Sequence, residues 1–418
     1  MSGISLYVHI PFCASRCPYC DFATAPATSR LRSRYVDALV TEIQEEGRAL
    51  GRPRLRTVFV GGGTPSLLEP EEVGRISAAI EGAFDRRPRE VTFEANPATL
   101  DRARLGAWLA FGATRISIGA QSFSERGLRA LGRTHQPSDV APAVEAARSY
   151  GLAVNLDLIF GWPGQTPADW LADLDRATAL GPDHLSCYPL ELSQEPEEAV
   201  ANWPGAGWPA LERWRRRTAR RQADDRGLAL LYALAHRRLA RRGSRHYEIS
   251  NWARPGKESL HNLTYWRNGQ WLGVGAGSHS HLAGVRSRRP AALTAYVDQV
   301  ERGLPREVDA HSDAAVDGAI LGLRLDRGID LARFSARFGH ASRDRLVSGL
   351  AKLDGRALVR WTGDRVRLTP RGRILANEVF VHLVPDEGAT TSGRSPAEQD
   401  GRTSPWDGRP PTPVARSA

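Results

Sequence analysis

The sequence contains few cysteines and no long hydrophobic run, and each shortage excludes a class of protein. Its 418 residues include four cysteines, too few for the disulfide framework of a small secreted protein. The longest apolar stretches, such as residues 228–235, are far shorter than the roughly 20 residues that cross a bilayer. The N-terminus shows no basic segment followed by an apolar one, as a secretory signal would. We therefore expect a cytoplasmic protein that is not integral to a membrane.

Acidic residues are also in deficit. The formal net charge is +10, which permits contact with nucleic acid, anionic lipid or a ligand that carries carboxylates. The densest basic runs are residues 213–217, 220–221 and 237–245. None belongs to a recognised nucleic-acid module, so we interpret them as solvated helix faces and predict no nucleic-acid partner.

Three of the four cysteines form one motif, CxxxCxxC, at Cys13, Cys17 and Cys20, directly after a strand-like segment. Three thiolates can hold three irons of a cubane iron–sulfur cluster and leave the fourth iron without a protein ligand. An open coordination position distinguishes a reactive metal site from a closed structural one, and S-adenosylmethionine (SAM) is its usual occupant. A zinc site, with His9 as a fourth ligand, and three unrelated thiols are the alternatives that the spacing alone leaves open.

Strand-like and helix-like segments alternate through the first 190 residues. The predicted strands are residues 6–10, 57–60, 90–94, 115–118, 153–160 and 184–188. The predicted helices are residues 34–50, 70–84, 101–111, 139–150 and 167–180. This alternation indicates βαβ units and a parallel sheet. Six units fit an incomplete (β/α)6 barrel better than a closed barrel of eight strands.

Polar or glycine-rich residues follow these strands, where ligands of parallel α/β sheets bind. The first strand leads to the cysteines, and the second to Gly61-Gly-Gly-Thr-Pro65, where a backbone without side chains can approach a ligand. The third ends at Glu94, a carboxylate suited to a ribose diol, the fourth at Gly119-Ala-Gln-Ser122, and the fifth carries Asp157. Glu94 or Asp157 alone could be a helix cap. Their occurrence in this order predicts one ligand site.

These motifs resemble the radical SAM superfamily, and in particular its coproporphyrinogen dehydrogenase-like branch, from about residue 4 to about residue 385. The matching segments are Tyr7-Val-His-Ile-Pro-Phe-Cys13, Gly61-Gly-Gly-Thr-Pro-Ser66, Ile116-Ser-Ile-Gly-Ala-Gln-Ser-Phe123, Leu131-Gly-Arg133 and Asn155-Leu-Asp-Leu158. The resemblance implies that Cys13, Cys17 and Cys20 bind a [4Fe-4S] cluster. It implies that SAM is bound by Tyr7, Tyr19, Gly62, Gly63, Thr64, Glu94, Gln121, Arg133 and Asp157. In this superfamily the reduced cluster cleaves SAM to a 5′-deoxyadenosyl radical.

Two functions compete within that branch: oxygen-independent coproporphyrinogen III oxidase, an enzyme of heme synthesis, and the HemW family of heme chaperones. The oxidase has a further cysteine where this chain has Phe22, and it carries an N-terminal extension that this chain lacks. Residues 261–266 match the HNxxYW motif associated with HemW. The resemblance therefore favours a chaperone that binds heme and delivers it to acceptors, expected to be respiratory proteins at the membrane. Whether SAM is cleaved is not decided by the sequence.

Heme requires an axial ligand, an apolar face and charges for its propionates. His261, with Tyr265 and Trp266 beside it, is the predicted ligand, and His279 and His281 are competitors. The alternative is that His261 is a structural residue that forms hydrogen bonds under the barrel.

The predicted domains are a radical SAM core (1–230), a barrel extension (231–310), a winged-helix-like α+β domain (311–385) and a disordered tail (386–418). The third domain combines helices at 315–325, 331–338, 342–353 and 374–383 with strands at 358–361 and 366–368. We interpret Cys187 as a buried, inert thiol. We interpret Trp203, Trp208 and Trp214 as local core rather than a porphyrin platform.

Overall fold

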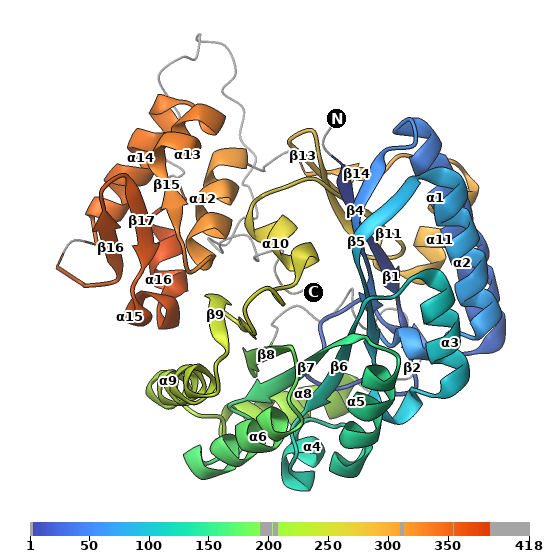
Figure 1. The fold of residues 1–418 in the computed structure, drawn as a ribbon, viewed down its shortest axis with the longest axis horizontal. Helices are drawn as coiled ribbons and strands as arrows, with labels where there is room; N and C mark the ends of the chain where they lie inside the picture. Colours follow the sequence, from blue (N-terminus) through green and yellow to red (C-terminus); the bar gives the residue numbers. More distant parts are fainter. Residues whose placement is uncertain (1–2, 193–202, 204–207, 310–312, 354, 385–418) are drawn as a thin grey trace. The chain divides into compact units, whose positions relative to one another are not determined.

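The computed structural model describes residues 3–192, 203, 208–309, 313–353 and 355–384. The chain forms two compact units that divide after Ser312 (Figure 1). The first unit includes strands from both the predicted core and the predicted extension. The predicted tail, 386–418, lies outside the described residues. Within the described part of the chain, no helix has the length and apolar character needed to cross a membrane.

The first unit is built on one open sheet of 12 strands in the order β14-β13-β12-β11-β1-β4-β5-β6-β7-β8-β10-β9. The strands that come first in the chain are β1 (Ile4–Ile10), β4 (Arg54–Gly62), β5 (Asp85–Ala95), β6 (Arg115–Gln121), β7 (Ala153–Phe160) and β8 (His184–Pro189). Later strands are β9 (Arg245–Glu248), β10 (Asn251–Ala253), β11 (Trp271–Val274), β12 (His279–Leu282), β13 (Val285–Arg288) and β14 (Glu307–Val308). The strands from β11 to β8 pair in parallel, and the outer ones are antiparallel.

The six predicted strands are present, and the sheet stays open because β14 and β9 form its two edges. The predicted incomplete barrel is therefore confirmed. The strands of the first unit that follow residue 240 were not predicted individually. They are short, so hydrophobic periodicity is a weak signal for them.

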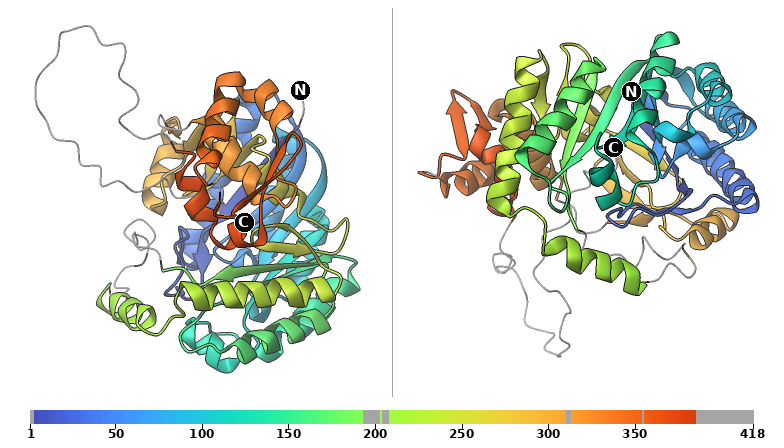
Figure 2. Two further views of the ribbon diagram at one scale, coloured as in Figure 1. Left: turned by 90° about the vertical axis from the view of Figure 1, so that its left-hand side faces the viewer. Right: turned by 90° about the horizontal axis from the view of Figure 1, so that it is seen from below.

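Helices connect the strands and cover the outer face of the sheet (Figure 2). They are α1 (Ser29–Ala49), α2 (Pro70–Ala83), α3 (Arg102–Phe111), α4 (Glu125–Ala130), α5 (Val140–Ser149), α6 (Pro167–Ala179), α9 (Asp225–Arg241) and α11 (Leu293–Glu301). Two further helices are α8 (Trp208–Ala219) and α10 (Leu260–Trp266), and single turns occur at η1 (Pro65–Leu67), η2 (Pro97–Thr99) and η3 (Pro137–Asp139). The boundaries follow capping chemistry: Thr166 and Asp169 form a capping box at the start of α6.

The two faces of the sheet differ in polarity because side chains alternate along each strand. Val58, Ile116 and Leu156 are fully buried in the apolar core beneath the helices. Thr57 and Asn155, one position away, bond to polar groups on the opposite face. A parallel sheet packed on both faces reads as continuous apolar runs. The polar inner face of this sheet is instead suited to a ligand.

The second unit combines helices with a small sheet in the order β15-β17-β16. Its elements are α12 (Ala314–Arg324), β15 (Ile329–Asp330), α13 (Leu331–Phe338), α14 (His340–Ala351), β16 (Val359–Thr362), β17 (Arg365–Leu368), α15 (Pro370–Ile374) and α16 (Ala376–Val381). The winged-helix-like prediction is confirmed, with two differences in detail. The third strand, β15, has only two residues and gives no periodic signal. The predicted helix 374–383 is divided between α15 and α16 at Leu375, whose φ of −104° and ψ of 35° are not helical.

Candidate functional site

The three motif cysteines follow β1: Cys13 ends β2 (Phe12–Cys13), and Cys17 and Cys20 lie in the loop between β2 and β3 (Ala25–Pro26). The Cys13 Sγ lies 3.6 Å from the Thr64 Oγ1 at the end of β4. The Cys17 Sγ accepts a hydrogen bond from the Arg133 guanidinium at 3.6 Å. Two sulfur atoms of this segment thus contact side chains of the neighbouring loops after β4 and α4.

Burial raises the pKa of the Cys13 thiol to about 11, against the lowering effect of its hydrogen bond with Thr64. Burial also raises the pKa of Cys20. Metal binding at this loop must therefore displace protons, and the Arg133 cation partly opposes the rise of the Cys13 pKa. Among the described residues, no three His, Cys, Asp or Glu side chains are arranged to hold a single metal ion. Three thiols in one loop next to a cation fit the donor set of an iron–sulfur cluster.

The three glycines at the end of β4 lie so close to neighbouring groups that a side chain would not fit at any of them. A Cβ atom on Gly61 would lie 2.8 Å from the Glu94 carboxylate, and one on Gly62 would lie 2.4 Å from the His9 ring. A Cβ atom on Gly63 would lie 2.8 Å from the Pro11 backbone. Gly62 also has a φ of 117°, a conformation that strains other residues. These positions require glycine, and they leave backbone exposed to a ligand.

Two carboxylates, Glu94 on β5 and Asp157 on β7, enter the site from the strands on either side of β6. The Glu94 Oε2 accepts a hydrogen bond from the Gly62 N–H at 2.8 Å. Burial raises the Glu94 pKa to about 8, the Gly62 bond opposes the rise, and Asp157 adds to it. Asp157 accepts hydrogen bonds from Ser117 at 2.7 Å and Asn155 at 2.8 Å. Burial raises the Asp157 pKa, although these bonds and the Arg133 charge oppose the rise.

Gln121 and Arg133 are the remaining polar residues at this edge of the sheet. Gln121 has a φ of 60°, an uncommon conformation for a residue with a side chain, and the β6–β7 register shifts just before it. The Arg133 guanidinium donates to the Gly119 carbonyl at 3.2 Å as well as to Cys17. Arg133 therefore ties the cysteine loop to the end of β6.

The two tyrosines predicted to bind SAM lie on different elements, Tyr7 on β1 and Tyr19 in the cysteine loop. The Tyr7 hydroxyl lies 3.0 Å from the His9 Nδ1, and burial raises the Tyr7 pKa. Tyr19 packs against an apolar cluster that contains Leu131 and Trp162. Most of the residues predicted to bind the cluster or SAM thus lie at the carboxyl ends of β1, β4, β5 and β6 or in the loops that follow them. Tyr7 and Asp157 lie within β1 and β7, and Arg133 follows α4. The ligand roles of the individual side chains stay predictions.

His261 lies elsewhere, near the opposite ends of these strands. It is fully buried, with its Nδ1 2.8 Å from the Thr57 hydroxyl and its Nε2 2.8 Å from the Tyr265 hydroxyl. Burial lowers its pKa to about 3. The structural alternative is compatible with this geometry. The heme-ligand role stays a prediction, and it requires at least one of these hydrogen bonds to open.

The other predicted heme ligands differ in exposure. His279 is exposed, whereas His281 is buried and has its Nδ1 2.8 Å from the Gly269 carbonyl oxygen. Cys187 is fully buried in the core on β8. Trp203 and Trp214 make hydrogen bonds within the first unit, and the Trp208 side chain lies outside the described part of the structure.

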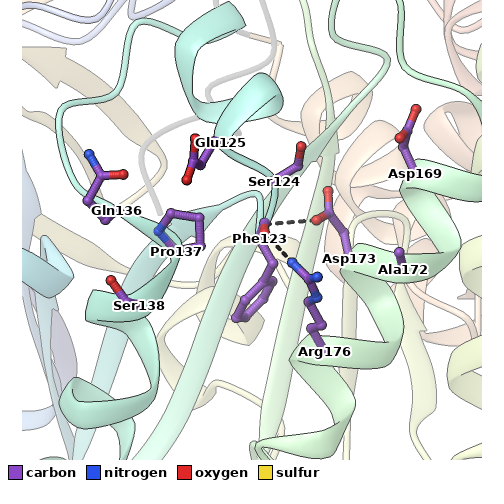
Figure 3. Close-up of a pocket in the computed structure, with 10 residues that line it drawn as sticks. All are labelled: Phe123, Ser124, Glu125, Gln136, Pro137, Ser138, Asp169, Ala172, Asp173 and Arg176. Carbon is purple, nitrogen blue, oxygen red and sulfur yellow. Dashed lines mark hydrogen bonds between the residues drawn. The ribbon is translucent and has the colours of Figure 1, made fainter.

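Asp173 is a residue that the sequence analysis missed. From α6 it accepts hydrogen bonds from the Ser122 hydroxyl and the Phe123 N–H, both at 2.8 Å, directly after Gln121. Arg176 donates to the Phe123 carbonyl at 2.6 Å, and these groups line a cleft of about 540 Å³ (Figure 3). Burial raises the Asp173 pKa to about 6. Within an amphipathic helix, an aspartate of this kind gives no signal in a single sequence.

Comparison with known proteins agrees with the fold. The radical SAM superfamily model matches residues 7–177, and the HemN C-terminal domain model matches residues 310–375. The solved structure of coproporphyrinogen III oxidase (HemN) from Escherichia coli aligns with a TM-score of 0.77 at 23% identity, covering 91% of this chain and 90% of that one. That likeness shows the fold alone. The class is therefore that of radical SAM proteins.

Similarity to curated relatives defines the family within that class. The heme chaperone HemW of Mycobacterium tuberculosis is 37% identical over 389 residues, covering 91% of this chain and 94% of that protein. HemW of Bacillus subtilis is 33% identical over 384 residues, with coverage of 90% and 98%. HemW of Escherichia coli is 38% identical over 286 residues, with coverage of 67% and 70%. The chain belongs to the HemW family.

Proposed function

We propose that this chain binds a [4Fe-4S] cluster, SAM and heme, and that it works in the cytoplasm as a heme chaperone. The observation that carries the proposal is that the carboxyl ends of the parallel strands lie beside the three-cysteine loop, in a chain of the HemW family. We propose respiratory proteins at the membrane as the acceptors of heme. This follows from the family resemblance and has no contact in the structure behind it.

The cluster, when bound, supplies an iron with an open position and the capacity to transfer one electron. Cys13, Cys17 and Cys20 would hold it. Thr64 and Arg133, which contact two of these sulfurs, would influence the electron density on the thiolate ligands. Hydrogen bonds to the sulfurs and local charge are the levers by which a protein tunes such a cluster.

The protein groups around the open iron match the polar ends of SAM. The Glu94 carboxylate suits the ribose diol, because its two oxygens can accept both hydroxyl groups. The backbone from Gly62 to Thr64 would bind the methionyl amine, and Arg133 would bind the methionyl carboxylate. Heme transfer requires no radical, so in a chaperone the bound SAM acts as a regulator of conformation or affinity.

The second candidate function is oxidative decarboxylation of coproporphyrinogen III, suggested by the shared fold of the Escherichia coli enzyme. We expect the reconstituted protein to bind heme and to leave coproporphyrinogen III unconverted. The measurement is one anaerobic preparation given each compound in turn, with SAM and a reductant present. Product formation above the cluster-free control would favour the oxidase. Absence of specific heme binding in the wild type would refute the chaperone proposal.

A second prediction concerns the heme ligand. We expect His261→Ala to weaken heme binding or to shift the Soret band, while the iron–sulfur absorbance is unchanged. Thr57→Val is the matched control, because it removes one hydrogen-bond partner of the imidazole and leaves the ligand in place. The Thr57 variant should keep the wild-type heme spectrum. Wild-type heme spectra in both variants would transfer the ligand role to another residue, and the exposed His279 would be examined first.

A further inference from the structure

Helix α8 is anchored beside the cysteine loop. The Trp214 indole N–H donates to the Ala130 carbonyl at 3.2 Å. Two residues after Ala130, a Cβ on Gly132 would lie 2.5 Å from Pro18, which places this segment against the cysteine loop. The Trp203 indole N–H donates to the Thr24 hydroxyl at 3.1 Å, at the far end of the same loop.

The charge of α8 also reaches the cysteine loop. In the cysteine loop, the Arg16 guanidinium donates to the Cys20 carbonyl at 3.0 Å, and the Arg215 cation of α8 lies close enough to repel it. In turn, burial lowers the Arg215 pKa, while the Glu212 and Asp21 charges raise it. Charged side chains of α8 and of the cysteine loop therefore interact with one another.

The opposite side of α8 is a row of exposed arginines. Arg213, Arg216 and Arg217 are exposed at positions i, i+3 and i+4, which lie on one helix face, and the exposed Arg220 follows directly after the last residue of α8. Glu212 is the one acidic residue in the described part of this helix, and it pairs with Arg216 at 2.9 Å. We call Arg213, Arg216, Arg217 and Arg220 the arginine face.

We propose that the arginine face is the docking surface for a small acidic one-electron carrier protein that reduces the cluster. The inference rests on the proposed cluster at Cys13, Cys17 and Cys20. One electron leaves the carrier and enters the cluster, so the carrier is oxidised as the cluster is reduced, and no covalent bond changes. A basic surface beside a redox centre raises the encounter rate of acidic partners about 10- to 1000-fold.

An acidic protein fits this surface better than an anionic membrane. A helix that lies on a membrane inserts an apolar face into the lipid. In α8 the Trp214 side is bonded to the protein, and Thr218 on that side is 3% exposed. The row at 213, 216, 217 and 220 carries charge alone, which suits the small, polar and transient interfaces of electron-transfer pairs.

The test is charge reversal on this face in the reconstituted full-length protein. We expect R213E/R217E to slow cluster reduction by reduced flavodoxin at least about tenfold at low salt, and to lose the salt dependence of the wild type. The matched control is R237E/R241E on α9, also an exposed i, i+4 pair near a helix end, which should stay within about twofold. Anisotropy with labelled, oxidised flavodoxin should show the same contrast in affinity.

Three observations separate the outcomes. The cluster absorbance is recorded before mixing, so loss of the cluster is distinguished from loss of docking. Reduction by photoreduced deazaflavin, a small molecule, should proceed at one rate in all variants. Equal flavodoxin rates in R213E/R217E and R237E/R241E would overturn the proposal. A normal flavodoxin rate combined with lost binding to phosphatidylglycerol vesicles would overturn it too, because the face would then be a lipid-binding surface.

Discussion

We expect the alanine variants of Cys13, Cys17 and Cys20 each to lose the iron–sulfur cluster completely after anaerobic reconstitution. Each thiolate holds one iron of a cubane cluster, and no fourth protein ligand is available in the motif to replace a missing one. The measurement is iron and sulfide content together with the charge-transfer absorbance of the reconstituted protein.

Cys187→Ala is the matched control for these variants. Its thiol is fully buried in the apolar core on β8, and burial raises its pKa. A buried thiol of this kind behaves as a small hydrophobic side chain. The variant should therefore load a full cluster. A requirement for Cys187, or a full cluster without one of the three motif cysteines, would show that the ligand set is wrong.

Local patterns predict the strands and helices of the first half of the chain well. The segment 153–160 was expected as a strand and is one from end to end, and the other predicted strands differ only in their ends. Each strand is followed by residues that have a chemical reason to be there. Gly62, for example, requires a positive φ and an approach that leaves no room for a side chain. Such constraints act within a few residues, so a single sequence shows them.

The contacts that organise the site are not local, and the sequence does not predict them. Glu90 on β5 accepts backbone hydrogen bonds from Leu260 and His261 at 3.1 and 2.9 Å, across some 170 positions of the chain. These two bonds hold the start of α10 against β5, and the His261 side chain is buried there. The motif made His261 attractive as a ligand, but burial and partners depend on tertiary structure. Asp173 was missed for the same reason.

The glycine loop after β11 is another example of a distant constraint. Glu42 on α1 is fully buried and accepts hydrogen bonds from the Gly275 N–H at 2.7 Å and the Tyr296 hydroxyl at 2.8 Å. The Arg289 and Arg306 guanidinium groups pair with it at 2.7 and 2.9 Å. A buried carboxylate is stable only with such partners. In the sequence, Glu42 resembles any charged residue of an amphipathic helix.

We expect Glu94→Ala to weaken SAM binding without loss of the cluster. At a pH above the Glu94 pKa of about 8, where the carboxylate is ionised, losing its charge-assisted hydrogen bond costs about 1.5–3 kcal/mol, which corresponds to roughly a 10- to 150-fold change in affinity. Glu94→Gln should also bind weakly, although its amide oxygen can still accept the Gly62 N–H that orients the glycine loop. Glu125→Gln on α4, where the side chain is exposed, is the control and should bind like the wild type. Affinity is measured by titration of the reduced cluster, whose spectrum SAM should perturb.

The pH dependence of the same titration identifies the Glu94 carboxylate directly. Its pKa is raised to about 8 in the ligand-free protein, chiefly by burial, so below that pH the group carries a proton. The neutral acid can no longer offer two acceptor oxygens to the ribose diol. SAM affinity in the wild type should therefore rise as the pH increases through about 8 and then level off. The amino group of SAM also titrates in this range, so the informative quantity is the difference between wild type and Glu94→Gln. Parallel pH profiles in these two proteins, or an unchanged affinity in Glu94→Ala, would remove Glu94 from the SAM site.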